Sequence, residues 1–294
     1  MAPSEVSSAM KLCISQATTL SSTFEADLDA YALAGWSDVE LWFTKLEAFL
    51  QGRPALAAKE LLDARGLRAV AAAQQGGLLL STGDERATHW DLFRRRLDLL
   101  ATMEVPVLVV AVDFTREAVG EDYARAVASL TEAAALAGAA GVCLALEFQK
   151  TSRFCASLDT AVALVAQAGA ANLGVCLDLF HYYTGPSKFE DLGYLTKDNL
   201  AWVQVSDLSG TPRELAGDAD RILPGDGDFL LDPIIDHLAR LGYAGHLSLE
   251  VNNPQLWAVP PDRLADAGLR AMTRLLGSRT PAPTNPSPAS RGSS

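Results

Sequence analysis

Eight apolar segments alternate with eight amphipathic ones along this chain, and that alternation restricts its fold more than any other feature of the sequence. The runs PVLVVAV at 106–112 and VCLALEF at 142–148 are almost wholly apolar, as is typical of parallel strands covered on both faces. We predict strands over residues 12–17, 38–43, 67–73, 106–112, 142–147, 173–178, 201–205 and 247–251. The intervening patterns predict helices over residues 23–34, 54–65, 85–103, 116–139, 158–168, 188–195, 230–241 and 262–276.

The count and spacing of these units predict a single (β/α)8 TIM barrel over residues 11–277. Gly35, Gly66 and Gly242 each follow a predicted helix, which is the usual signal for a helix C-cap. A doubly wound open sheet is the alternative, but no G-x-G-x-x-G sequence follows the first strand. We expect residues 1–10 to form a disordered leader and the Pro- and Ser-rich residues 278–294 to form a disordered tail.

The composition excludes several classes of protein. The net charge of −12 and the pI near 4.8 argue against nucleic acids and anionic membrane surfaces as partners, because those partners attract basic proteins. No apolar run approaches the roughly 20 residues that span a bilayer, and the first ten residues lack a secretory signal pattern. The four cysteines are widely spaced, so we expect buried thiols, no disulfide and a cytoplasmic location.

Four oxygen-bearing side chains close the last four predicted strands: Glu147, Asp178, Gln204 and Glu250. Each carboxylate taken alone is explained by an N-cap for the next helix or by a nearby arginine. The ends of consecutive strands in a parallel barrel lie side by side, however, so the four side chains should converge. Three converging carboxylates repel one another, and a hard divalent cation resolves that repulsion. The sequence therefore predicts a metal site at this end of the barrel.

These motifs resemble the xylose isomerase-like superfamily over roughly residues 11–277. Its members include sugar and sugar-phosphate isomerases and epimerases, hydroxypyruvate isomerase, inosose dehydratase and 3-dehydroshikimate dehydratase. The resemblance rests on AGWSDVEL at 34–41, LALEF at 144–148, CLDLFH at 176–181, VQVSD at 203–207, LPGDGDF at 223–229 and GYAGHLSLE at 242–250.

The resemblance implies that the metal ligands are Glu147, Asp178, Gln204 and Glu250. The third ligand is often His in this superfamily, whereas Gln204 resembles the hydroxypyruvate isomerase and dehydroshikimate dehydratase branches. An amide oxygen keeps the site all-oxygen, so Mn²⁺ or Mg²⁺ is expected ahead of Co²⁺ or Zn²⁺. The abasic-site endonuclease branch is disfavoured, because its metals rest on many histidines and this chain has four.

Other residues near the strand ends are candidate substrate contacts. His181 matches the D-x-x-H of the family in the loop after residue 178, and it is expected to contact a substrate hydroxyl or transfer a proton. Arg221 precedes the P-G-x-G loop and Arg213 lies in the same segment; a solvated surface position is the alternative for Arg221. Lys150 and Trp257 complete the predicted substrate-binding residues, with a solvated side chain as the alternative for Lys150.

The expected activity is a metal-dependent isomerisation or epimerisation of a sugar or keto-sugar by proton transfer through an enediolate. Glu147 and Glu250 would act on opposite sides of the substrate, one removing the proton and the other returning it. A lyase or dehydratase is the first alternative, because the same enolate can expel a leaving group. A non-catalytic sugar-binding barrel is the second. The partners expected are a small polyhydroxylated molecule and, in a homo-oligomer, further copies of this chain.

Overall fold

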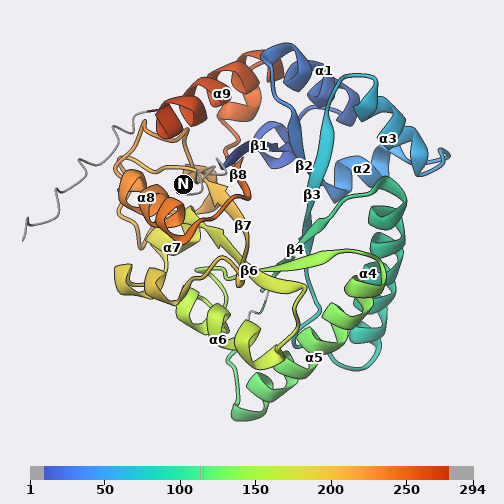
Figure 1. Ribbon diagram of the computed structural model, residues 1–294, viewed down its shortest axis with the longest axis vertical. Coiled ribbons are helices and arrows are strands. Elements are labelled where there is room, and N and C mark those ends of the chain that lie inside the picture. Colours follow the sequence, from blue (N-terminus) through green and yellow to red (C-terminus); the bar gives the residue numbers. More distant parts are fainter. Residues whose placement is uncertain (1–9, 113, 115, 278–294) are drawn as a thin grey trace, which may run out of the picture.

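The computed structural model describes residues 10–277 apart from residues 113 and 115 (Figure 1). Its eight parallel strands form a closed barrel in chain order, because β1 pairs with both β2 and β8. The predicted single TIM barrel is therefore confirmed, and the open-sheet alternative is wrong. The predicted leader and tail lie outside the described residues, apart from Met10. The strands are β1 (Lys11–Ser15), β2 (Asp38–Trp42), β3 (Arg68–Gln75), β4 (Val107–Ala111), β5 (Cys143–Glu147), β6 (Leu173–Asp178), β7 (Leu200–Val205) and β8 (His246–Leu249).

The helices surround the barrel as an outer ring, with α9 beside α1 where the chain closes on itself (Figure 1). None of the described helices is both long and apolar enough to cross a membrane. The α-helices are α1 (Phe24–Ala34), α2 (Phe43–Phe49), α3 (Leu56–Asp63), α4 (Gly83–Met103), α5 (Gly120–Ala139), α6 (Leu158–Ala168), α7 (Leu179–Thr184), α8 (Leu231–Leu241) and α9 (Pro261–Gly277). Four short 3-10 helices lie at η1 (Gln16–Thr19), η2 (Phe189–Tyr194), η3 (Asp218–Asp220) and η4 (Leu256–Ala258).

Two short helices differ from the sequence prediction. α2 and α7 begin at the residue directly after β2 and β6, where we predict no helix. The segment predicted as a helix at 188–195 forms the 3-10 helix η2 instead. Each of these elements has only six or seven residues, which is too few to display a helical period in the sequence.

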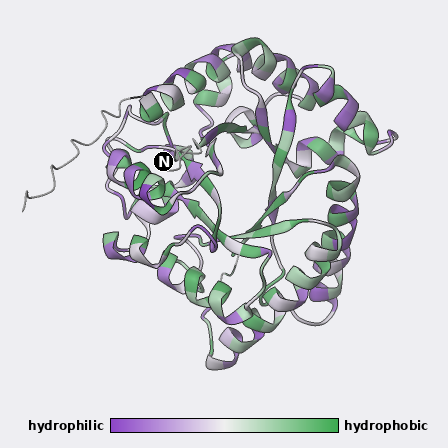
Figure 2. Cartoon of the chain, in the orientation of Figure 1, coloured by the Kyte–Doolittle hydropathy of each residue, from purple (hydrophilic) through white to green (hydrophobic). Residues whose placement is uncertain are grey.

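Side chains of the strands alternate between the barrel interior and the layer beneath the helices. The strands are mostly hydrophobic, whereas the helices carry both hydrophobic and hydrophilic residues (Figure 2). Trp202 is buried inside the barrel and is accommodated by small neighbours, as expected for a tightly closed barrel. All four cysteines are free. The interior cluster consists of Cys13, Ala71, Ala73, Val109, Ala145, Cys176 and Trp202.

The end of the barrel where the strands begin carries a buried ionic contact. Asp38, at the start of β2, accepts hydrogen bonds from His246 Nε2 at 3.2 Å and Arg68 Nε at 2.9 Å. The ring of His246 also packs on Trp202, with ring centroids 5.4 Å apart. Burial opposes the ionisation of Asp38, but the contacts with His246 and Arg68 outweigh burial and lower its pKa below the usual value. This end of a TIM barrel generally contributes to stability and not to catalysis.

We expect the Asp38 carboxylate to make stability depend on pH. Because its folded pKa is depressed, its contribution is complete above the unfolded pKa and disappears as the pH falls through the folded pKa. Asp38→Asn should destabilise the protein by on the order of 1 kcal/mol at pH 7, and the difference from wild type should shrink towards pH 3. Urea unfolding at several pH values measures this, with the exposed Asp84→Asn as control. A difference that does not change with pH would contradict the assignment.

Candidate metal-binding active site

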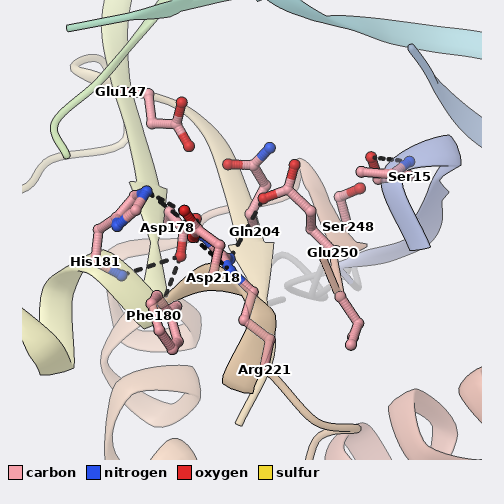
Figure 3. A network of polar contacts seen from close by, with 12 residues as sticks. Ser15, Glu147, Asp178, Phe180, His181, Gln204, Asp218, Arg221, Ser248 and Glu250 are labelled. Carbon is pink, nitrogen blue, oxygen red and sulfur yellow. Dashed lines mark hydrogen bonds and ion pairs between the residues drawn. The ribbon is translucent and has the colours of Figure 1, made fainter. Parts of the chain in front are cut away.

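The strand register brings the four predicted ligands to one end of the barrel (Figure 3). Asp178 and Gln204 are direct partners across β6 and β7. Glu147 is level with Cys176, two residues before Asp178, and Gln204 is level with Ser248, two residues before Glu250. This stagger is the normal shear of a closed barrel, and it leaves the inward-facing side chains on one side of the cavity. The four predicted ligands are at most 4% exposed, so water screens their charges little.

Glu147 is held by two side-chain amides. Gln74 Nε2 donates to Glu147 Oε2 at 2.6 Å, and Gln149 Nε2 donates to the same oxygen at 3.2 Å. Burial, and then the negative charge of Asp178, raises the pKa of Glu147 to about 8. The two amides act in the opposite direction, because they stabilise the carboxylate form. Glu147 is thus a buried carboxylate whose orientation is fixed by neutral donors.

Asp178 ends β6 and also caps the helix that follows. Its Oδ1 accepts hydrogen bonds from the backbone N–H groups of Phe180 at 2.7 Å and His181 at 3.3 Å, which begin α7. The sequence prediction puts His181 in a loop, which is wrong, because the cap starts a helix at once. Burial is the main cause that lowers the pKa of His181, so its imidazole is neutral near pH 7.

Arg221 lies between the carboxylates, where it is 1% exposed (Figure 3). Its Nη2 atom is 2.8 Å from Asp178 Oδ2 and 2.8 Å from Asp218 Oδ1, and its Nη1 atom is 3.4 Å from Glu250 Oε2. The guanidinium also stacks on Phe180, with the carbon of the guanidinium 4.4 Å from the ring centroid. The alternative of a solvated surface arginine is therefore wrong. Arg221 supplies positive charge to a cluster that is otherwise acidic.

The loop that carries Arg221 is organised around the buried carboxylate of Asp207. Its Oδ2 accepts from the backbone N–H groups of Gly225 at 2.9 Å and Gly227 at 3.1 Å, and its Oδ1 accepts from Phe229 at 3.0 Å. Gly225 has a φ of +85°, which favours glycine. At Gly227 a Cβ atom would lie 2.4 Å from Asp207 Oδ1, so the carboxylate approaches too closely for a larger residue.

A second polar layer lies deeper in the barrel, below Gln204. The Nε2 atom of Gln204 donates to Glu40 Oε1 at 2.9 Å, and its Oε1 atom accepts from Cys176 Sγ at 3.2 Å. Ser248 Oγ donates to Glu40 Oε2 at 2.5 Å. Burial raises the pKa of Glu40 to about 7, although the hydrogen bonds from Ser248 and Gln204 act in the opposite direction. Glu40 therefore connects β2 with β7 and β8 through the interior.

The donor set fits a divalent cation. Glu147, Asp178 and His181 each offer a ligand atom, and these atoms lie within 4.8 Å of one another. His181 Nδ1 is buried and makes no hydrogen bond within the part of the chain that the structure describes, whereas the buried Asp178 Oδ2 atom faces the guanidinium of Arg221 at 2.8 Å. Burial also raises the pKa of Glu250 well above its usual value, and Glu40, Asp178 and Glu147 add to that effect. A cation at this position would relieve the repulsion among the carboxylates.

The remaining predicted substrate-binding residues differ in their burial and in their hydrogen bonds. Lys150 is partly buried, and its Nζ atom donates to the carbonyl oxygens of Arg213 at 3.0 Å and Ala216 at 2.5 Å. The side chain of Arg213 is exposed. Trp257 is partly buried in η4, and its indole Nε1 donates to the carbonyl of Ala17 at 3.0 Å.

Sequence reasoning missed three polar residues that support the site: Gln74, Gln149 and Glu40 in its role below Gln204. A usable signal was present for the two glutamines, since each lies at or just beyond the end of an apolar strand. The same rule that identified the carboxylates would have found them. The contact of Glu40 crosses the barrel over 164 residues of sequence, and no local pattern reports such a contact.

The Asp207 loop leads to a prediction about stability. Gly227→Ala would force its Cβ atom against Asp207 and the carbonyl of Leu208, so we expect a melting temperature lower by about 5 °C. Gly217→Ala is the matched control, because that glycine lies in the same connection and has open space around its Cβ position. Circular dichroism melts of both variants provide the measurement. Equal melting temperatures for the two variants would show that the loop tolerates the close contact.

Comparison with known proteins agrees with this fold. Residues 28–275 match the family model described as the xylose isomerase-like TIM barrel. Inosose isomerase of Halalkalibacterium halodurans is 26% identical over 256 residues, which cover 84% of this chain and 90% of that protein. The 3-dehydroshikimate dehydratase of Pseudomonas aeruginosa is 26% identical over 259 residues, which cover 87% of this chain and 40% of that protein.

Solved structures share the fold. One described as the IOLI protein with a binding zinc atom superposes with a TM-score of 0.86 at 22% sequence identity, and the match covers 92% of this chain and 99% of that one. At this level of identity the likeness concerns the architecture. The family model, in contrast, spans most of the sequence, including all four strand-end residues and Arg221. The chain belongs to the xylose isomerase-like TIM barrel family.

Proposed function

We propose that this protein is a metal-dependent isomerase or epimerase of a small cyclic polyol, sugar or keto-sugar. The observation that carries the proposal is the convergence of the buried residues Glu147, Asp178 and His181, whose ligand atoms lie within 4.8 Å of one another. The relative named inosose isomerase supports the substrate class, because an inosose is a cyclic polyhydroxylated ketone. We see no phosphate-binding glycine loop after β7 in the sequence, which favours an unphosphorylated substrate.

The metal would be held by Glu147, Asp178, Gln204 and Glu250, with His181 close enough to share in binding. A divalent ion at this position supplies charge that makes a proton next to a carbonyl group more acidic. Oxygen donors dominate the set, so we propose Mn²⁺ or Mg²⁺ as the physiological ion.

Glu147 and Glu250 would transfer the proton. Gln74 and Gln149 both donate to Oε2 of Glu147, and we assign Oε1 of Glu147 to proton removal. Glu250 comes from β8, on the other side of the site, and would return the proton (Figure 3). Return to the neighbouring carbon gives an isomer, and return to the opposite face of the same carbon gives an epimer. Arg221 would hold a substrate oxygen while its other contacts keep it in place.

A lyase is the second candidate. It is favoured by the buried, neutral imidazole of His181, which lies beside the carboxylates and would take up the proton removed from the substrate and then, as imidazolium, donate it to a departing hydroxyl group. The dehydratase relative supports the same chemistry, although this chain covers 40% of its length. Release of water next to a carbonyl creates a conjugated enone, which absorbs ultraviolet light. Absorbance during turnover therefore separates this candidate from isomerisation.

We expect Glu147→Gln to lower kcat by roughly 10³-fold, because the amide cannot accept the proton. Hydrogen exchange of a panel of inososes, ketoses and 3-dehydroshikimate in deuterated water, followed by NMR, measures the step directly. Glu60→Gln on the exposed face of α3 is the control for removal of a glutamate charge. Full exchange activity in Glu147→Gln would remove this residue from the mechanism.

Removing the metal should destabilise the protein. At about one hundred times its dissociation constant, a bound ion contributes about 2.7 kcal/mol to the free energy of unfolding. Thermal melts with Mn²⁺, Mg²⁺, Co²⁺ or Zn²⁺, and then with a chelator, measure this contribution. Asp178→Asn should abolish the shift, since an asparagine keeps an oxygen to cap α7 but loses the charge. A wild-type melting temperature that none of these ions changes would rule out the proposed metal dependence.

A further inference from the structure

The amide of Gln204 has a fixed orientation that its neighbours determine. An amide presents a carbonyl oxygen on one side and an NH₂ group on the other, and only the oxygen binds a metal ion. The Nε2 atom of Gln204 donates to Glu40 Oε1 at 2.9 Å, and the Oε1 atom of Gln204 accepts from Cys176 Sγ at 3.2 Å. The NH₂ end of Gln204 therefore faces Glu40, and the oxygen faces away from it, towards the opposite side.

That opposite side is the metal-binding side. The Oε1 atom of Gln204 is 3.2 Å from Cys176 Sγ on β6, the strand that also carries Asp178. In Figure 3 the amide oxygen points towards the side occupied by Glu147 and Asp178. The amide of Gln204 thus lies between Glu40 in the barrel interior and the proposed metal site at the barrel end.

Glu40 is itself held in place from the other side. Ser248 Oγ donates to its Oε2 atom at 2.5 Å, which leaves Oε1 aligned with Gln204. Glu40 and Ser248 are both completely buried, and their strands meet through β1 at the closure of the barrel. Because both oxygens of the Glu40 carboxylate are hydrogen-bonded, its orientation towards the amide of Gln204 is fixed.

We propose that Glu40 is a positioning residue that fixes the amide of Gln204 with its oxygen towards the metal. This inference rests on the proposed function, since it concerns a ligand of the same site. It goes beyond that function in assigning a role to Glu40, which is buried in the barrel interior and contacts Gln204. On this proposal, the neutral amide of Gln204 serves as a ligand because the hydrogen bond to Glu40 orients it.

The test is the affinity for Mn²⁺, measured from the free ion by electron paramagnetic resonance. Glu40→Gln has the same shape but can donate as well as accept, so the amide of Gln204 is free to turn. We expect it to weaken Mn²⁺ binding roughly tenfold or more, as is usual when a residue that orients a ligand is lost. Asp38→Asn is the matched control: it removes another buried carboxylate from the same strand, and Asp38 contacts His246 and Arg68 at the opposite end of the barrel. It should retain most of the affinity.

A double-mutant cycle separates orientation from simple loss of charge. In a Gln204→Ala background there is no amide to orient, so Glu40→Gln should change Mn²⁺ affinity by less than about threefold, within ordinary non-additivity. An equal loss in both backgrounds would mean that Glu40 acts only through its charge and would overturn the inference. If Glu40→Gln does not fold, Glu40→Asp provides the same comparison, because it withdraws the acceptor by one methylene group.

The outcomes distinguish the inference from the function it rests on. Wild-type protein that binds no Mn²⁺ would contradict the metal-dependent function and the role of Glu40 together. If the wild type binds Mn²⁺ and Glu40→Gln binds it with the same affinity, the positioning role of Glu40 is overturned. The proposed activity would still stand in that case.

Discussion

Negative charge buried at one end of the barrel is the constraint on which the rest of the site depends. Glu147, Asp178, Glu250 and Glu40 are all at most 4% exposed, and burial of so many carboxylates is unfavourable unless each is compensated. The fold compensates them with side-chain amides, with hydroxyl groups, with the first turn of a helix and with the guanidinium of Arg221. Glu147, Asp178 and His181 each offer a ligand atom for one further positive charge.

The groups that compensate these carboxylates are themselves held in place by further residues, which lie outside the proposed set of metal ligands. The guanidinium of Arg221 is aligned by stacking on Phe180, and its backbone carbonyl is held by Asn253 Nδ2 at 2.9 Å. The connection that carries it is in turn built around Asp207 and two glycines. A substitution far from the metal ligands can therefore reach the chemistry through this connection.

The sequence was sufficient for the architecture, because the alternation of strands and helices is a local pattern. Apolar runs mark buried parallel strands, and a charged residue at the end of such a run must face the barrel mouth. The bounds of β6 and α6 agree with the prediction to the residue. The burial of Arg221 and the interior contact of Glu40 were beyond reach, because they depend on pairings between distant strands and on the conformation of one loop. The site assignments themselves remain predictions.

Asp178 belongs to two structures at once. One of its oxygens starts α7, and the other faces the cluster where the cation is expected. In many enzymes the catalytic groups are a burden on stability, and evolution can discard them without harm to the fold. In this protein Asp178 is both a proposed metal ligand and the cap that stabilises α7. A descendant that lost its activity would still be under selection to keep this aspartate or a close substitute, so its presence in a related sequence is weaker evidence of catalysis than the presence of Glu147.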